Sequence, residues 1–347
     1  MSGSNGHPRA PTRRTLAGWL GAAALAPTLM SRRAFAAQNK AAILLPGSIN
    51  DQSWNAAGFA GAEALKAKGW DVAYSENVTP ADMAEAMRDY ASRGTGLVIG
   101  HTGRFLSAAQ QIAADFPKTV FMVGSGAAGA GTNVTSVDYD NVQYGYLMGV
   151  LAAKMSKSGK VGSVNGLEGL PNVVAQVGGF RKGAKSVDPK VEVKVIYIQN
   201  MEDAAEAKEA ALSLISGGAD FVAGKLNAGH AGIIQAAKER GAMAYGRSYG
   251  HTAIAPDNVA SNIVEKWGEM YGAAGDQARA GTLGGKFQVF GLATQGSSGA
   301  ELGYRPGTAF NPRVPADAVA AVEEARKKFA SGDLKVAVTR DDAKGGV

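Results

Sequence analysis

The residues with the clearest capacity for ligand chemistry surround Trp54. This indole follows the loop after a buried apolar run and begins a helical pattern, and Asn50, Asp51 and Asn55 flank it. A flat ring in such a place can stack a planar ligand, and the neighbouring amides and carboxylate can hydrogen-bond its polar atoms. Two alternatives stay open: Trp54 packs into the core, and Asp51 only caps the helix.

The sequence contains few residues that could support nucleophilic, metal or cofactor chemistry. The chain has no Cys, and after residue 36 its only histidines are His101, His230 and His251, none of them in a metal-spaced pair. The segment 124–129 matches the G-x-G-x-x-G spacing, but an extended run at 134–137 follows instead of the helix that a dinucleotide site requires. We therefore predict a non-enzymatic binding protein with no catalytic residue, no metal and no cofactor.

The first 36 residues have the features of a cleaved export signal. Arg13 and Arg14 precede a weakly apolar stretch at 16–30, which is too short and too rich in Gly, Ala and Pro for a membrane span. An Ala-Phe-Ala sequence ending at Ala36 predicts cleavage after it. The paired arginines resemble a Tat signal, with a Sec signal or an uncleaved anchor as alternatives. Because a lipid anchor needs a Cys at the cleavage point, we predict a soluble periplasmic protein without one.

Length and composition describe an ordinary globular protein. The 347 residues are 46% apolar and 19% charged, with 47 Gly and 7% aromatic residues. This balance excludes fibrous, disulfide-stapled and wholly disordered classes, and the length favours two domains. The leader holds five Arg and no acidic residue, so its removal lowers the formal charge from +6 to +1. A near-neutral mature chain gives no support to a nucleic-acid partner.

Short apolar runs alternate with helical patterns along the mature chain, and the pattern restarts after about residue 140. Strands are expected in the first half at 41–45, 72–74, 97–99 and 120–123, and in the second at 160–164, 191–198, 221–223 and 243–245. Such alternation is typical of parallel sheets with helices on both faces, so we predict an α/β fold with two doubly wound halves. Late strands at 259–263 and 287–290 are expected to cross back between the halves.

The predicted boundaries give two lobes and a short tail. The first lobe takes residues 37–139 and about 259–290, and the second takes 140–258 and about 291–335. Residues 336–347 form the tail, whose end we expect to be frayed. Two doubly wound halves that face each other leave a cleft between them.

Topology predicts which loops line this cleft, because ligands of open parallel sheets bind beyond the carboxyl ends of the strands. The loops are those at 47–54, 100–104, 124–131, 165–172, 225–230 and 246–251. Besides the residues around Trp54, they carry polar side chains that we predict as ligand contacts: His101, Thr102, Asn165, Asn227, Arg247 and Tyr249. Arg247 has two open roles, contact with an anionic ligand or a structural ion pair with an acidic residue.

Six segments between about residues 41 and 283 carry a further signal in their order and spacing. They are Gly47-Ser-Ile-Asn-Asp-Gln-Ser-Trp-Asn55 with Gly61, Leu97-Val-Ile-Gly-His101, Tyr146-Leu-Met-Gly-Val-Leu-Ala-Ala153, Phe180-Arg-Lys-Gly-Ala184, Gly218-Ala-Asp220, and Gly232-Ile-Ile-Gln-Ala-Ala237 before Gly241. In this order they resemble the basic membrane protein (BMP) family of ABC-transporter substrate-binding proteins, which includes bacterial purine nucleoside receptors. The resemblance implies a two-lobed type I periplasmic binding protein with three crossover strands, and an ABC permease in the inner membrane as partner.

A few positions bear on the ligand that the resemblance implies. Family members that bind purine nucleosides often have Gly-Val-Asp, whose Asp holds the ribose hydroxyls, where this chain has Gly246-Arg247-Ser248. A second stacking Phe common in the family corresponds to Gln176. Trp54 and Trp267-Gly-Glu-Met-Tyr271 are more similar to a proteobacterial branch linked to purine bases. The resemblance therefore implies a purine base, or a nucleoside held in another way.

Our prediction is a monomeric periplasmic receptor of an ABC importer. It stacks a purine-like ligand on Trp54, closes its lobes over the ligand and delivers it to the permease. Two other classes stay open: a nucleoside-processing enzyme of doubly wound fold, and a sensory receptor with the same ligand. A flavin or another flat heterocycle is the alternative guest.

Overall fold

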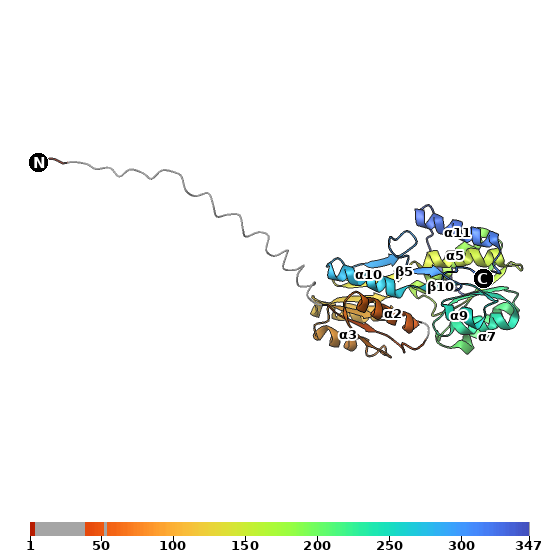
Figure 1. The fold of residues 1–347 in the computed structure, drawn as a ribbon, viewed down its shortest axis with the longest axis horizontal. Helices are drawn as coiled ribbons and strands as arrows, with labels where there is room; N and C mark the ends of the chain where they lie inside the picture. The colour runs from red at the N-terminus through yellow and green to blue at the C-terminus, as the bar shows by residue number, and fades with distance from the viewer. Residues whose placement is uncertain (4–38, 52–53, 347) are drawn as a thin grey trace.

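Two bodies lie side by side in the molecule. The computed structural model describes residues 1–3, 39–51 and 54–346, so residues 4–36 of the predicted leader and its cleavage point lie outside this description. One body carries α2 (Trp54–Ala67), α3 (Met83–Ser92) and α10 (Trp267–Arg279), and the other carries α7 (Ala204–Ser216) and α9 (Tyr249–Ile254) (Figure 1). Within the described ranges, no helix combines the length and the apolar character that crossing a membrane requires.

The first sheet is wholly parallel, with the strand order β11-β5-β4-β3-β1-β2. Its strands are β1 (Lys40–Leu44), β2 (Asp71–Ser75), β3 (Leu97–Gly100), β4 (Val120–Gly124), β5 (Val134–Tyr139) and β11 (Phe287–Phe290), and α4 (Phe105–Ile112) with a 3-10 turn (Ala113–Asp115) also packs on it. Strands β3, β4 and β5 are buried throughout, as parallel strands covered on both faces must be. Because β1 lies between β2 and β3, the winding direction changes there, and the loops after β1 and β3 diverge.

The second sheet repeats this order as β12-β10-β9-β8-β6-β7. Its strands are β6 (Lys160–Gly166), β7 (Glu192–Ile198), β8 (Phe221–Lys225), β9 (Met243–Gly246), β10 (Val259–Glu265) and β12 (Ala300–Leu302), of which β12 alone runs antiparallel to its neighbour. Its helices include α5 (Asn141–Met155), α6 (Pro171–Val187) and α8 (His230–Arg240), with α11 (Ala316–Ser331) against α5. The predicted fold class, with two doubly wound sheets, is confirmed.

The chain passes between the lobes three times. It leaves the first sheet between β5 and α5, returns between β10 and α10, and leaves again between β11 and β12. The structure places β10, predicted with the first lobe, in the second sheet, where it pairs with β9 and β12. The chain rejoins the first lobe only at α10, which packs on α2. A run of apolar residues identifies a strand, but it does not identify the strand's neighbour.

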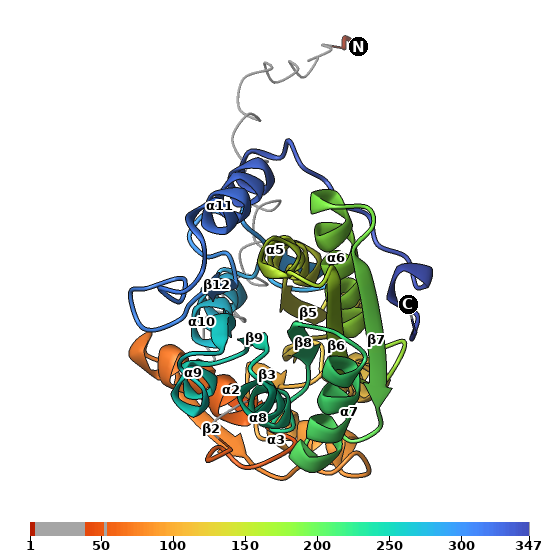
Figure 2. The ribbon, with the colours of Figure 1, turned by 90° about the vertical axis from the view of Figure 1, so that its right-hand side faces the viewer.

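The last residues pack against the second lobe, although the sequence predicts a frayed end. A 3-10 turn, Asp341–Ala343, lies on α6, and the side chain of Ala343 is buried. Val195 of β7 and Gly346 exchange two backbone hydrogen bonds of 2.8 and 2.9 Å, so this segment occupies the outer edge of β7 (Figure 2). Arg181 of α6 donates to the carbonyl oxygens of Asp342 and Gly346 and fixes the same segment.

Helices α5 and α6 lie side by side at very close range (Figure 2). Glycines on both helices face the backbone of the other: Gly145 and Gly149 on α5, and Gly179 and Gly183 on α6. A methyl group at Gly149 would lie 2.1 Å from the carbonyl oxygen of Phe180, closer than a real Cβ can approach. The pair therefore depends on the absence of side chains at its contact.

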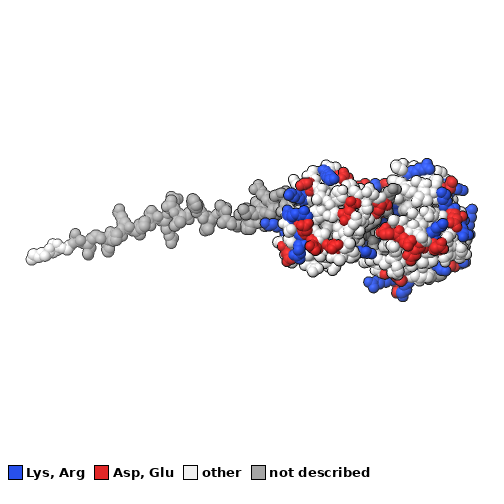
Figure 3. Space-filling model, turned by 90° about the horizontal axis from the view of Figure 1, so that it is seen from below, with Lys and Arg blue, Asp and Glu red and all other residues white. Residues whose placement is uncertain are grey.

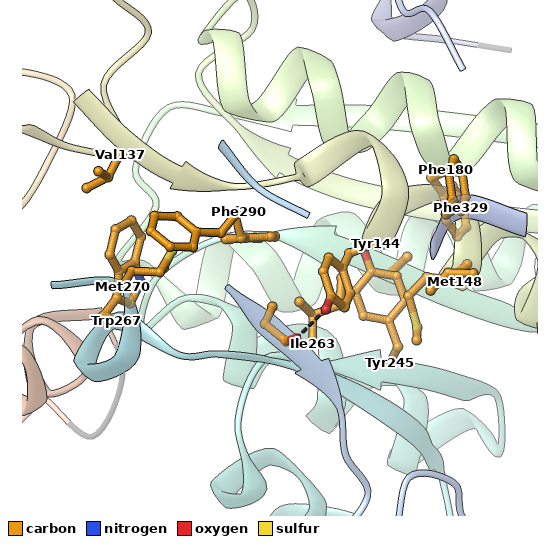
Figure 4. Packing of buried hydrophobic residues seen from close by; sticks show 14 of the residues in the cluster. Val137, Tyr144, Met148, Phe180, Tyr245, Ile263, Trp267, Met270, Phe290 and Phe329 are labelled. Carbon is orange, nitrogen blue, oxygen red and sulfur yellow. Dashed lines mark hydrogen bonds between the residues drawn. The ribbon is translucent and has the colours of Figure 1, made fainter. Parts of the chain in front are cut away.

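One apolar cluster continues through both lobes. Figure 4 shows it extending from Val137 and Phe290, beside the crossings, through Tyr144 and Ile263 to Phe329 of the second lobe. The crossings thus lie inside packed core, and the two lobes share one hydrophobic interior at their junction.

Candidate functional site

A cavity of about 570 Å³ lies between the lobes, at the carboxyl ends of both sheets. Its wall combines loops after β1, β3 and β4 with loops after β6, β7, β8 and β9, and a furrow between two rounded bodies is visible on the surface (Figure 3). Small-molecule sites have volumes of about 300–1,000 Å³, so this one can hold a metabolite. Six predicted contacts line it: Asp51, Trp54, Asn55, Thr102, Asn227 and Arg247.

Trp54 begins α2 and lines the cavity, while its ring is fixed by its neighbours. The imidazole of His101 stacks on the indole with 4.2 Å between ring centroids and 22° between planes, and Trp267 meets it edge-on at 5.2 Å. The indole Nε1 donates to the carbonyl oxygen of His101 at 3.0 Å. Trp54 is half-buried, so one part of its side chain packs on the core, as one of the two interpretations predicts, while another part lines the cavity. Its orientation is therefore set before any ligand arrives.

His101 lies behind Trp54 and does not line the cavity. Its side chain is fully buried; Nε2 donates to the carbonyl oxygen of Trp54 at 2.9 Å, and Nδ1 accepts from the Tyr271 hydroxyl at 2.7 Å. Burial lowers the pKa of His101 to about 4, so the ring is neutral at physiological pH. His101 therefore supports the indole of Trp54 from behind.

Asp51 caps the N-terminus of α2, which is the second alternative that the sequence leaves open. Its carboxylate accepts from the backbone N–H groups of Asn55 and Ala56, each at 2.9 Å. The same carboxylate accepts from the Asn55 side-chain amide at 2.7 Å, and Asn55 in turn accepts from the Gly47 N–H at 3.0 Å. The cap therefore holds the loop that forms one side of the cavity.

Three further predicted contacts are absent from the cavity wall. Asn50 is exposed on its loop. Asn165 is buried in the sheet, where its amide donates to Ser163 at 2.9 Å. The Tyr249 hydroxyl donates to Glu301 at 2.9 Å. Asn50 and Tyr249 follow the ends of β1 and β9, but position in a loop does not fix the direction in which a side chain points, and Asn165 still belongs to β6.

A smaller cavity of about 240 Å³ adjoins the first, and Trp54, Asn227 and Arg247 belong to both walls. The guanidinium of Arg247 forms an ion pair with Glu265, and the two side chains are only 10% and 6% exposed. Burial alone raises the pKa of Glu265, but Arg247 and Lys225 outweigh it and hold that pKa below its ordinary value. Of the two roles predicted for Arg247, the structural ion pair is thus present.

A cluster of buried charges lies at the crossings, and the sequence patterns did not predict it. Lys225 lines the main cavity, and its Nζ donates to the Tyr139 hydroxyl at 2.8 Å and to the Asn141 side-chain carbonyl at 2.7 Å. Burial lowers the pKa of Lys225, and burial raises the pKa of Asp138 nearby. Glu265 lies 3.9 Å from Lys225 and completes the cluster. A charged residue at the end of an apolar strand, as at 225 and 265, is the signal that points to such a cluster.

Acid should destabilise the fold through its buried histidines. Burial lowers the pKa of His101 and His251 to about 4, and that of His230 well below 6.5. Between pH 6.5 and 4 the unfolded chain binds protons that the folded chain excludes, so stability present above pH 6.5 is lost as the pH falls. The loss over this range is roughly 3 kcal/mol each for His101 and His251, and His230 acts in the same direction. Burial also raises the pKa of Asp138 and of Asp140, and these two carboxyl groups oppose the loss that the three histidines cause. Urea unfolding should therefore give a lower free energy of unfolding at pH 5 than at pH 7.

The matched variant for this titration is His251→Asn, whose side-chain carbonyl can replace the imidazole Nδ1 that accepts from the Arg247 N–H at 2.9 Å. It removes one of the three titrating groups and should show a smaller loss between pH 7 and pH 5. Equal or greater stability of the unsubstituted protein at pH 5 would contradict the role of the histidines.

Comparison with known proteins shows which family the chain belongs to. The model of the Bmp family, described as PnrA-like ABC transporter substrate-binding proteins, matches residues 38–297. The chain belongs to the Bmp family. The predicted family is thereby confirmed, and the molecule is a solute-binding protein of the ABC-transporter type.

Relatives of this Bmp-family chain are named for different functions. It is 30% identical over 257 residues to the transcriptional activator protein Med of Bacillus subtilis, covering 74% of this chain and 80% of Med. It is 30% identical over 202 residues to a purine-binding protein of Brucella abortus, covering 58% of this chain and 57% of that protein. An ABC transporter solute-binding protein from Conexibacter woesei has a similar structure, with 31% identity, a TM-score of 0.68, and coverage of 86% of this chain and 98% of that chain.

Proposed function

We propose that this Bmp-family protein is a periplasmic receptor that binds a purine base, or a similar planar ligand, and delivers it to an ABC permease. The ligand stacks on Trp54 in the cavity between the lobes, and Asp51, Asn55, Thr102, Asn227 and Arg247 surround it. The lobes close over the ligand and open at the permease. We propose further that the receptor acts as a monomer and releases its ligand chemically unchanged.

The observation that carries this proposal is the fixed indole of Trp54 on the wall of an interlobe cavity. His101 and Trp267 hold the ring, so a flat guest can stack without paying for ordering of the side chain. The purine-binding relative from Brucella abortus supports the same ligand class. A base is favoured over a nucleoside because Arg247 stands where nucleoside-binding members have the segment with a ribose-binding acid.

Native mass spectrometry of freshly purified protein, followed by a thermal-shift panel, tests the ligand class. We expect a retained mass equal to that of an intact purine, and a raised melting temperature with purine bases. A ligand at about a hundred times its dissociation constant adds about 2.7 kcal/mol, which such melts detect readily. Riboflavin tests whether the protein binds a flavin, and adenosine tests whether it binds a nucleoside. No shift with any of these compounds, or a retained compound that is chemically converted during incubation, would contradict the proposal.

A hydrogen bond between the lobes supports closure. The Asn172 amide of the second lobe donates to the Ser125 hydroxyl of the first at 2.8 Å, and both residues line the main cavity. Ser125 in turn donates to the buried Asp138 at 2.9 Å, so the contact at the cleft is tied to the charge cluster at the crossings. We propose that this bond forms on closure and slows release.

Replacing Ser125 with Ala should therefore raise the dissociation rate of a bound purine about fivefold, with little change in the association rate, because a hydrogen bond of this kind contributes about 1 kcal/mol. Stopped-flow dissociation measures the effect. Asn172→Ala removes the same bond and should give the same rate, and the double variant should add nothing further. Additive effects of the two substitutions, or an unchanged dissociation rate, would exclude the bond as a latch.

Sensing is the second candidate function, and the relation to Med, which is named a transcriptional activator, favours it. Both candidates share the ligand and the cavity. Uptake of a radiolabelled purine by cells that lack the gene distinguishes them: reduced uptake supports transport, and normal uptake with an altered transcriptional response to the purine supports sensing.

A further inference from the structure

We propose that the Arg247–Glu265 ion pair is the specificity element of the site, and that it selects uncharged planar ligands over anionic ones. The inference rests on the proposed function and adds the charge class of the ligand. The pair lies on the wall of the smaller cavity, and Arg247 also lines the larger one, so both compartments beside Trp54 face it.

The charges that line the two cavities balance one another. The acidic residues are Asp51, Glu202 and Glu265, and the basic residues are Arg104, Lys225 and Arg247. Most of these charges already have partners: Asp51 caps α2, and Glu202 accepts from the Asn227 amide at 2.5 Å. Lys225 donates to three neutral side chains, and its acidic neighbours are Glu265, at 3.9 Å, and Asp138. Arg104 is exposed to solvent, where its charge is screened. A ligand with a net charge would therefore meet no buried counter-charge of its own.

Burial sets the Arg247–Glu265 pair, with Lys225 beside it, apart from the other charges of the cavity walls. A charge acts strongly only where water is excluded, and these two side chains are 10% and 6% exposed. Several groups hold Glu265 from different elements: Arg247 from the loop after β9, the Tyr139 hydroxyl at 3.1 Å from β5, the Trp267 indole N–H at 2.7 Å from α10, and Lys225 at 3.9 Å from β8. The carboxylate cannot swing away to release the guanidinium for an anionic ligand.

The pair also shows how a neutral heterocycle can be recognised. The guanidinium offers N–H donors and the carboxylate offers acceptor oxygens side by side. A purine edge carries ring nitrogen acceptors beside N–H donors, which matches such a wall without any net charge. An anionic purine adds a net negative charge, which faces the fixed negative charge of Glu265 where water is excluded.

Adenine, which is neutral at pH 7, and urate, a planar purine that is a monoanion at pH 7, are the probes. Isothermal titration of the full mature chain should give adenine an affinity at least about tenfold higher than that of urate. Glu265→Gln leaves Arg247 without its counter-charge and should reduce this ratio about tenfold or more. Arg247→Gln leaves the carboxylate and should change the ratio in the opposite direction.

Two further variants separate selectivity from folding. The double variant Arg247→Gln with Glu265→Gln removes both charges and should keep the preference for adenine even if the affinity falls, and it decides the question if a single variant does not fold. Glu269→Gln is the matched control, since Glu269 forms an exposed ion pair with Lys266 at 3.1 Å on the same segment and lines neither cavity. Its ratio should stay within about twofold of the unsubstituted protein.

The outcomes distinguish this inference from the proposed function. Suppose that the unsubstituted protein binds adenine, but the two single variants do not change the adenine-to-urate affinity ratio in opposite directions. This outcome overturns only the proposed role of the ion pair. A preference of the unsubstituted protein for urate also overturns it. If the unsubstituted protein binds neither purine, both the inference and the proposed ligand class fail.

Discussion

Trp54→Ala should weaken purine binding by about tenfold to a hundredfold while leaving the fold intact. Stacking of a base on an aromatic side chain contributes about 1–3 kcal/mol, and the indole of Trp54 needs no reorganisation because His101 and Trp267 already hold it. Isothermal titration with adenine measures the loss. Trp54→Phe keeps a smaller ring and should recover part of the affinity.

Phe59→Ala is the matched control for this experiment. Phe59 is an aromatic residue of the same helix, half-buried against Tyr74 with 5.0 Å between ring centroids, and it lines neither cavity. The substitution should reduce stability without changing the affinity for adenine. If Trp54→Ala and Phe59→Ala change the affinity equally, the indole acts through packing of α2 and not through contact with the ligand.

Gly149→Ala should destabilise the protein by roughly 1–3 kcal/mol, the usual range for an overfilled core. The added methyl group would lie 2.1 Å from the Phe180 carbonyl oxygen and 2.7 Å from the Ala184 backbone nitrogen, and neither backbone atom can move without separating α5 from α6. The same two helices carry Asn141 and Gln176, which hold Lys225 at the cavity. Urea unfolding should show the loss of stability, and adenine affinity should fall with it.

Gly272→Ala provides the comparison, because it is the same substitution inside a helix with a different neighbour. At that position the nearest atom is the flexible end of Lys68, at 3.0 Å from the added carbon. Ala is favoured over Gly within helices by about 1 kcal/mol, so this variant should be as stable as the unsubstituted protein or slightly more so. Equal losses in the two variants would show that the close approach of α5 and α6 is not what matters at Gly149.

The sequence predicts most of the fold because strand and helix patterns are local. Each sheet has the expected alternation of buried strands and covering helices, and each expected strand lies close to an observed one. Partners across the sheet are not local, which is why β10 lies in the second sheet and the chain returns to the first lobe only at Trp267. The tail shows the same limit: its attachment to Val195 depends on an edge that no pattern within 336–347 reveals.

The site was predictable to the level of loops, and less so to the level of side chains. Topology brings Trp54, Thr102, Asn227 and Arg247 to one cavity, as expected for residues after the ends of parallel strands. The same rule also selects His101, whose ring turns inward because both of its nitrogens find buried partners. Lys225 and Glu265 were not predicted, because each needs contacts with residues of the other lobe to tolerate burial.

The three crossings set an order for the assembly of the protein during synthesis. The first sheet receives its edge strand β11 from residues 287–290, and α2 is covered by α10 from residues 267–279. Both arrive on the ribosome after all of β6 to β10. The amino-terminal lobe is therefore completed only after β6 to β10 of the other lobe have been synthesised, and the unfinished first sheet exposes β5 and α2 until more than a hundred later residues have emerged.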